Sequence, residues 1–203
     1  RDRSVSRGLG DVYKRQGQTT PTSYFVDAAE REKKGGQAFY SCLEYNSEIY
    51  FGSDNGRVWC YQKENGQFQL QNLPASSRIV SINSVEGNEL IFTTAKDGFF
   101  SYQPKTKAIE HFPASRFPNA SIHSVYVDKA SEVWFEQHIP GTVVHFNPRT
   151  RILKQEKVPV EPTSTDRSRP AFHIHEDING VLWVHPYGCL LYTSPSPRDT
   201  ERS

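Results

Sequence analysis

Histidine and acidic side chains gather near the end of the sequence, where their spacing could serve a metal ion. His173 and His175 are two residues apart, so on a β-strand both side chains would point to one face. Zinc is bound by imidazoles that share a face, and Glu176, Asp177 and His185 are close by in the sequence. No matching ligand recurs elsewhere in the chain, and short motifs of this kind often arise by chance. The pattern therefore favours core or solvent-lined histidines, and we expect no metal site and no cofactor.

Motifs of other reaction centres are absent from the sequence. There is no Gly-x-Ser-x-Gly, no His-Glu-x-x-His and no glycine-rich phosphate loop. The turn Asp177-Ile178-Asn179-Gly180 is similar to the start of a calcium loop but lacks the later acidic ligands, so a side-chain-capped turn is expected. Trp59, Trp134 and Trp183 could stack on sugars, yet packing in a core explains them better. We expect no catalytic residues in this chain.

A repeated unit must position any site that the chain carries. Its register can be counted from one apolar position, which is followed each time by a second apolar or aromatic residue. The four copies of that position are spaced 41, 43 and 49 residues apart: Ile49, Leu90, Val133 and Leu182. Repeats of roughly 40–50 residues with four short strands each are typical of a β-propeller. Helical periodicity is absent.

The predicted fold class is all-β, a partial β-propeller of about three and a half four-stranded antiparallel blades. Because closed propellers have about four to eight blades, we expect a fragment with exposed apolar faces. The expected organisation is a linker or preceding-blade tail at 17–38, blades at 39–77, 78–120 and 121–170, and a truncated blade at 171–188. The expected strands are 39–45, 48–52, 57–61, 67–71, 79–85, 89–93, 99–102, 108–112, 122–127, 132–136, 142–146, 151–155, 172–176 and 181–185, with an earlier one at 23–26.

Both ends of the chain look foreign to this pattern. Asp11–Gln16 and Cys189–Ser194 can be encoded by DNA segments that are nearly reverse complements, and both resemble translated sequencing-adapter DNA. We therefore interpret residues 1–16 and 189–203 as adapter artefacts and exclude them from the predicted fold. The two segments carry net charges of +3 and zero, so the total of +1 leaves residues 17–188 at −2. That charge favours no nucleic-acid partner.

Cys42 and Cys60 are the two cysteines inside the repeats. They fall on the first and third strands of one blade, with a strand between them, so a disulfide is not expected. Two buried thiols are the simpler prediction.

Two stretches carry a likeness to a known repeat: His173–Val184 (HIHEDINGVLWV) and Ser124–Pro148 (SVYVDKASEVWFEQHIPGTVVHFNP). They resemble the two-component regulator propeller repeat, in which a turn Asp precedes Gly-x-Leu-Trp and a third strand ends in Tyr-Asp-Pro. The likeness covers roughly 39–188 and is weaker in the first two repeats. The matching residues are Asp128 and Asp177 in the turn, Gly180, Leu182 and Trp183 in the second strand, and Gly141, Val143 and Phe146-Asn147-Pro148 in the third.

The resemblance implies a sensor function. In that family such propellers form the periplasmic region of hybrid two-component histidine kinases, which are inner-membrane proteins, and many respond to oligosaccharides. The implied partners are the remaining blades and the downstream sensor and kinase domains of the same chain, with a dimer as the intact protein. This fragment itself is expected not to be an enzyme.

Loops at one face of the propeller are the expected ligand surface. The loops that join second to third strands share that face with the loops that join successive blades. Arginine and aromatic groups there could hydrogen-bond and stack on a carbohydrate, although solvated loop residues are the alternative. The candidate ligand-binding residues are Arg78, Arg116, His138, Arg167 and Tyr187.

Two other functions stay open. The chain could belong to a propeller-type polysaccharide lyase or glycosidase, or to a non-catalytic protein-interaction propeller. An enzyme should place acidic, His or Tyr groups around the central channel. A sensor should be followed by a membrane span and a kinase, so the neighbouring coding sequence would separate these functions.

Overall fold

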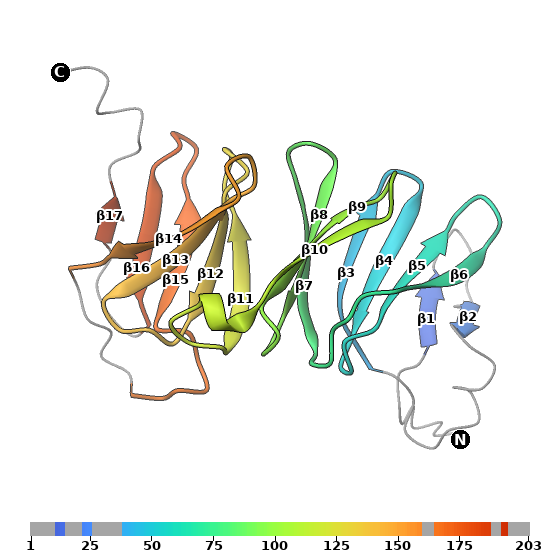
Figure 1. Ribbon diagram of the computed structural model, residues 1–203, viewed down its shortest axis with the longest axis horizontal. Coiled ribbons are helices and arrows are strands. Elements are labelled where there is room, and N and C mark those ends of the chain that lie inside the picture. Colours follow the sequence, from blue (N-terminus) through green and yellow to red (C-terminus); the bar gives the residue numbers. More distant parts are fainter. Residues whose placement is uncertain (1–10, 15–21, 26–37, 160–164, 188–191, 195–203) are drawn as a thin grey trace, which may run out of the picture. The chain divides into compact units, whose positions relative to one another are not determined.

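The computed structural model describes residues 11–14, 22–25, 38–159, 165–187 and 192–194. The described residues form short β-strands joined by tight turns, with a single 3₁₀ turn and no α-helix among them (Figure 1). The chain falls into two compact units, residues 1–82 and 83–203.

The first unit holds a two-stranded hairpin and a four-stranded sheet. The hairpin pairs β1 with β2, and the sheet has the order β3-β4-β5-β6, with all pairs antiparallel. Strand β7 starts at the end of this unit and runs into the next. The bounds are β1 (Asp11–Lys14), β2 (Thr22–Phe25), β3 (Phe39–Tyr45), β4 (Glu48–Ser53), β5 (Val58–Gln62), β6 (Gln67–Gln71) and β7 (Ile79–Val85).

Gly52 on β4 lets the start of β7 pack directly against the first sheet. A Cβ at this position would lie 2.5 Å from Cγ2 of Ile79, which is closer than carbon atoms can approach. The hydroxyl of Ser41 on β3 donates to the carbonyl of Ile79 at 3.1 Å. The second-strand position therefore has to be small here.

Cys42 and Cys60 of this sheet do not form a disulfide with each other, and only Cys60 is buried. The prediction of two buried thiols is wrong for Cys42. Along β3 exposed and half-buried residues alternate, and Cys42 falls on the exposed side together with Tyr40 and Glu44. The side chains of a strand point alternately to its two faces, so this thiol follows the exposed face of β3.

The second unit continues with three further sheets. Their orders are β10-β9-β8-β7, β11-β12-β13-β14 and β15-β16-β17, so each strand pairs with its neighbour in the sequence. The bounds are β8 (Glu89–Thr94), β9 (Phe99–Gln103), β10 (Ala108–Phe112), η1 (Ala114–Arg116), β11 (Ile122–Val127), β12 (Val133–Gln137), β13 (Thr142–Asn147), β14 (Ile152–Lys157), β15 (Phe172–Glu176), β16 (Leu182–Pro186) and β17 (Tyr192–Ser194).

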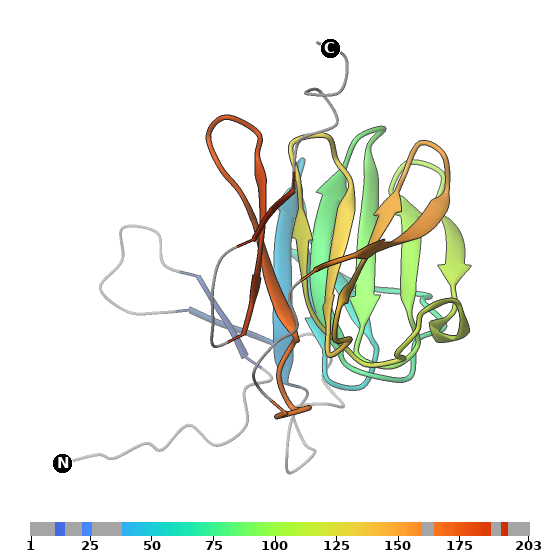
Figure 2. The same cartoon turned by 90° about the vertical axis from the view of Figure 1, so that its left-hand side faces the viewer.

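Strand β12 shows why the middle strands read as continuous apolar runs. Val133 and Phe135 point to one face and pack with Phe99 of the β7–β10 sheet. Trp134 points to the other face and packs with Ile174 of the β15–β17 sheet. Both faces are covered by a neighbouring sheet, so alternation between apolar and polar residues is lost. Figure 2 shows strands β15 and β16 (orange to red) and the β11–β14 sheet (yellow to orange) from the side.

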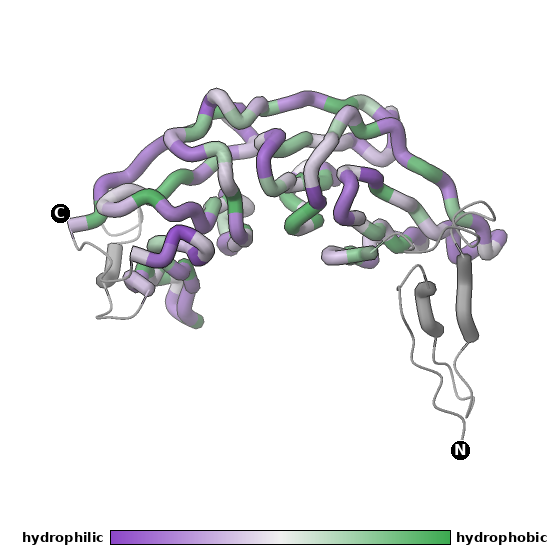
Figure 3. The backbone as a smooth tube through the Cα atoms, turned by 90° about the horizontal axis from the view of Figure 1, so that it is seen from below, coloured by the Kyte–Doolittle hydropathy of each residue, from purple (hydrophilic) through white to green (hydrophobic). Residues whose placement is uncertain are grey.

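The hydropathy of the chain changes over short distances, because the strands are short and polar turns interrupt them. Hydrophobic and hydrophilic segments follow one another closely along the tube in Figure 3. One core of the second unit fills the space between the β7–β10 and β11–β14 sheets, with Phe99 and Phe112 stacked at 4.5 Å between ring centres.

Consecutive antiparallel sheets that pack face to face are the blades of a partial β-propeller, as the repeat predicted. Every expected strand is present, and the ends differ from the prediction by at most two residues. Strands β1 and β17 lie inside the two segments that the prediction excluded from the fold. Strand pairing uses backbone groups that every residue except proline carries in full, so it makes little demand on the side chains of such segments.

Candidate functional site

Three loops of the second unit meet where β12 and β16 end and β15 begins. The backbone N–H of Ala171, just before β15, donates to the carbonyl of Gln137 at the end of β12, at 2.9 Å. The N–H of Tyr187, just after β16, donates to the carbonyl of Ala171 at 2.9 Å. These two bonds hold the loop before β15 between the loops that follow β12 and β16.

The side chains of this loop cluster combine an aromatic ring with nitrogen donors. The guanidinium carbon of Arg169 lies 4.8 Å from the ring centre of Tyr187, within the range of a cation–π contact. Nδ1 of His138 lies 3.2 Å from the carbonyl oxygen of Arg169, so this nitrogen carries the proton and donates. The ring of His173 lies 5.5 Å from that of Tyr187. We call His138, Arg169, His173 and Tyr187 the loop cluster.

The buried side-chain amide of Gln137 helps to hold the loop cluster in place. Gln137 is 3% exposed, and its Nε2 donates to the carbonyls of Asn119 and Ser121. Asn119 in turn donates from Nδ2 to the carbonyl of His138 at 3.3 Å. The loop between β10 and β11 is thereby fastened to the end of β12, which limits where His138 can move.

Glu136 joins the last two blades through a buried carboxylate. Its Oε1 accepts a hydrogen bond from the backbone N–H of Ile174 on β15 at 3.0 Å. Its Oε2 accepts from the hydroxyl of Ser124 on β11 and lies 3.4 Å from Nδ1 of His173. A buried carboxylate needs several donors to offset its lost hydration, and these three groups supply them.

The carboxylate of Asp166 lies close to the positive charge of Arg169 in the loop before β15. The carboxylate of Asp166 accepts hydrogen bonds from the hydroxyl of Ser168 at 2.6 Å and from its N–H at 2.9 Å. These bonds, with the nearby Arg169 guanidinium, lower the pKa of Asp166 below its usual value. The carboxylate therefore stays ionised and partly balances Arg169.

The structure brings two of the five predicted ligand residues together. His138 and Tyr187 meet through the backbone of Arg169 and Ala171, whereas Arg167 is exposed in the same loop. Arg116 lies over the Phe112 ring at 5.0 Å, and no described contact joins it to the loop cluster.

Arg78 belongs to the first unit, where its guanidinium lies 5.0 Å from the ring centre of Tyr40. Arg169 was missed by the sequence analysis. Its place two residues after Arg167 in a polar loop was the available signal. Nothing in the sequence pointed to the backbone of Ala171 as the link between the loops.

The three histidines considered as candidate metal ligands, His173, His175 and His185, lie on the neighbouring strands β15 and β16. His173 and His175 share a face of β15, and His185 is opposite His173 on β16. The rings of His173 and His185 are 5.3 Å apart. Across the described residues, no group of three or more His, Cys, Asp or Glu side chains is arranged to share a metal ion.

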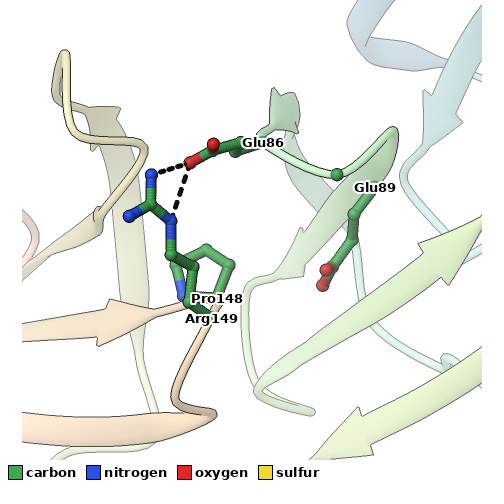
Figure 4. Close-up of a pocket in the computed structure, with 5 residues that line it drawn as sticks. Glu86, Glu89, Pro148 and Arg149 are labelled. Atoms are coloured by element: carbon green, nitrogen blue, oxygen red, sulfur yellow. Dashed lines mark hydrogen bonds and ion pairs between the residues drawn. The ribbon is translucent and has the colours of Figure 1, made fainter.

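An open pocket of about 290 Å³ lies at the opposite end of strand β13 from the loop cluster. It is bounded by the β7–β8 turn, with Glu86, and by the β13–β14 turn, with Arg149. Nε of Arg149 donates to Oε2 of Glu86 at 2.8 Å, so one ion pair joins the two turns (Figure 4). Glu89 also lines the pocket but is neutralised by Arg151, with Nη1 and Oε1 2.7 Å apart. The charges of the pocket are therefore already paired.

Solved structures of low sequence identity share this fold. The chain matches the extracellular domain of a protein classed as a hybrid two-component system (BT3049) from B. thetaiotaomicron with a TM-score of 0.64 and 14% identity, over 95% of this chain and 28% of that one. It matches virginiamycin B lyase from Staphylococcus aureus with a TM-score of 0.66 and 17% identity, over 93% of this chain and 64% of that one. An auxiliary nutrient binding protein from Bacteroides ovatus matches with a TM-score of 0.52 and 11% identity, over 76% of this chain and 36% of that one.

These matches establish the propeller fold, which proteins of different function share. No family model matches the sequence, and no curated protein matches it. The chain spans less than two thirds of the first two of these structures. Among the described residues, no helix is long and apolar enough to cross a membrane.

Proposed function

We propose that this chain is a blade segment of an extracytoplasmic sensor propeller, and that the intact protein is a hybrid two-component histidine kinase. Asp177 and Trp183, which carry the resemblance to two-component regulator repeats, are hydrogen-bonded to each other, and this supports the assignment. The other matching turn residue, Asp128, makes the same bond with Trp134 in the preceding blade. The fold shared with the extracellular domain of a hybrid two-component system is consistent with this role.

The ligand we propose is an oligosaccharide that binds at the loop cluster. The observation that carries this proposal is the Tyr187 ring with the Arg169 guanidinium over it, and the His138 imidazole bonded to the Arg169 carbonyl. An aromatic ring offers an apolar face to the C–H groups of a sugar, and a guanidinium donates hydrogen bonds to its hydroxyls. Nε2 of His138, whose proton is on Nδ1, can accept a hydrogen bond from a hydroxyl. Three loops that are fastened to one another hold these groups in place before a ligand arrives, which lowers the entropy cost of binding.

Location and partners follow from the same proposal. A sensor propeller of this kind lies in the periplasm, and its partners are the remaining blades and the downstream sensor and kinase domains of the same chain. The segment is non-catalytic, and the intact protein acts as a dimer. A change of shape at the loops then passes through blade-to-blade contacts such as Glu136 with β15.

The test is direct binding of oligosaccharides to the 203-residue chain. We would screen a glycan array of plant and host oligosaccharides and measure the best binder by isothermal titration calorimetry. Tyr187→Ala and Arg169→Ala should each weaken binding at least tenfold, because each removes one side of the contact. Arg149→Ala, in the pocket at the other end of β13, is the matched control and should leave the affinity unchanged.

Two results would overturn the proposal. Absence of any binder in the array, or equal affinity of the Tyr187→Ala variant, would remove the loop cluster as the ligand site. Cleavage of a bound oligosaccharide, seen as new reducing ends or unsaturated products, would instead favour a lyase or glycosidase.

A further inference from the structure

His173 and His185 form a cross-strand pair whose spacing suits a shared metal ion. The two residues are directly opposite each other on β15 and β16, and their ring centres are 5.3 Å apart. Both side chains are partly exposed. His175, the next residue on the same face of β15, is opposite Trp183 instead, so it has no imidazole across from it.

The expected spacing of two imidazoles on one metal ion can be worked out. A zinc–nitrogen bond is about 2.0–2.1 Å long, and the ring centre lies about 1.1 Å beyond the nitrogen, so each ring centre is about 3.2 Å from the metal. At a tetrahedral angle the two ring centres are then about 5.2 Å apart. The observed distance between the rings of His173 and His185 agrees with this value.

Glu136 sets the tautomer and the orientation of the His173 ring. Nδ1 of His173 faces Oε2 of Glu136 at 3.4 Å, and a carboxylate can only accept, so the proton sits on Nδ1. The lone pair is then on Nε2, the nitrogen available to a metal ion. Histidine ligands usually donate their other N–H to a carboxylate in this way, which sets the tautomer and the orientation of the ring. Glu136 is itself fixed by the N–H of Ile174, so its position is well defined.

We propose that His173 and His185 bind one divalent transition-metal ion, with Glu136 orienting His173. Imidazole pairs favour Zn²⁺, Cu²⁺ and Ni²⁺ over Mg²⁺ or Ca²⁺, which prefer oxygen ligands. No third His, Cys, Asp or Glu side chain joins the pair among the described residues, so water fills the remaining positions. Two protein ligands give a weaker site than the three or four of known zinc enzymes and zinc fingers.

The experiment measures Zn²⁺ binding to the 203-residue chain by isothermal titration calorimetry. His173→Ala and His185→Ala should each weaken binding more than tenfold, since one imidazole cannot chelate. His175→Ala is the matched control and should change the affinity less than twofold. Glu136→Gln should weaken binding about 10- to 100-fold, because an amide that donates toward Nδ1 moves the proton to Nε2.

A second measurement identifies the ligands directly. Electron paramagnetic resonance of bound Cu²⁺ should show coupling to two imidazole nitrogens, and to one in either histidine variant. Circular dichroism checks that each variant is folded, and His173→Gln and His185→Gln replace any alanine variant that is not. Binding of Zn²⁺ that is unchanged in the variants of both histidines would overturn the proposal, as would a failure of the unaltered chain to bind Zn²⁺ at millimolar concentration.

Discussion

The indole nitrogen of Trp134 donates a hydrogen bond to Oδ2 of Asp128 at 2.8 Å. The same bond recurs one repeat later, between Trp183 and Asp177 at 3.1 Å. In both turns the other carboxylate oxygen accepts two backbone N–H groups, those of the second and fourth residues after the Asp. One aspartate therefore shapes the turn and also fixes the tryptophan of the following strand. This dual role gives a physical reason for the Asp and Gly-x-Leu-Trp spacing in the repeat.

Loss of the indole donor should destabilise the third blade. In the Trp134→Phe variant the half-buried carboxyl of Asp128 loses a partner and the core loses volume, which should lower the free energy of unfolding by about 1–3 kcal/mol. Urea denaturation followed by circular dichroism measures the change. Trp183→Phe is the control and should cost less, because Trp183 is the more exposed of the two. Equal stability of Trp134→Phe and the unaltered chain would contradict this role of the bond.

The two turn aspartates should respond to pH in opposite directions. Burial raises the pKa of Asp128 above its usual 3.8, so its contribution to stability is present below that value and is lost as the pH rises through the raised pKa. Hydrogen bonds from the Val181 N–H and the Trp183 indole lower the pKa of Asp177, so its contribution is present above 3.8 and is lost as the pH falls through the lowered pKa.

Denaturation curves between pH 2 and pH 7 test this difference. The destabilisation caused by Asp177→Asn should shrink as the pH falls, whereas that caused by Asp128→Asn should shrink as the pH rises. Parallel pH profiles of the two variants would show that the environments of the carboxyls do not differ as described.

Arg151 should be worth more to stability than Arg149, although both form ion pairs between the second and third blades. Arg151 contacts both carboxylate oxygens of the buried Glu89, at 2.7 and 3.0 Å, and lies over the Phe112 and Phe146 rings. Burial works against the guanidinium charge, but the bonds to Glu89 and Glu110 outweigh it and raise the pKa of Arg151.

Substitution of each arginine by methionine separates the two ion pairs. Arg151→Met leaves the Glu89 carboxylate buried without its partner and should lower the free energy of unfolding by about 1–3 kcal/mol. This is less than the loss expected for a fully buried ion pair, because Arg151 is partly exposed to solvent. Arg149→Met removes an exposed pair with Glu86 and should cost less than about 0.5 kcal/mol. Thermal unfolding ranks the variants. If Glu89→Gln fails to recover stability in the Arg151→Met background, the uncompensated charge is not the cause.

Substitutions at Gly98 and Gly87 separate the cost of a strained backbone conformation from the cost of a steric clash. Both have a positive φ, of 86° and 84° respectively. A Cβ at Gly98 would lie 2.1 Å from the carbonyl oxygen of Phe112, whereas at Gly87 it would meet nothing within 4 Å. Gly87→Ala should therefore cost about 1 kcal/mol for the backbone alone, and Gly98→Ala clearly more than about 2 kcal/mol. Chemical denaturation provides the comparison, and similar costs at the two sites would refute the steric argument.

The repeat, its register and nearly every strand could be read from the sequence. Apolar positions such as Leu90 and Val133 recur at one blade length, and turn residues separate the strands, so each element is encoded by its own neighbours in the chain. Resemblance to a known repeat added the expected sensor role, which stays a proposal.

Only the tertiary structure decided which loop residues meet. His138 and Tyr187 come together because the backbone of Ala171 bonds to both of their loops, and Arg169 reaches Tyr187 by the path of that loop. The exposure of Cys42 and the 5.3 Å distance between the rings of His173 and His185 could likewise not be predicted from the sequence. Local sequence determines the conformation of each strand, but contacts between residues far apart in the chain depend on how the blades stack and where the connecting loops run, and no local pattern encodes these.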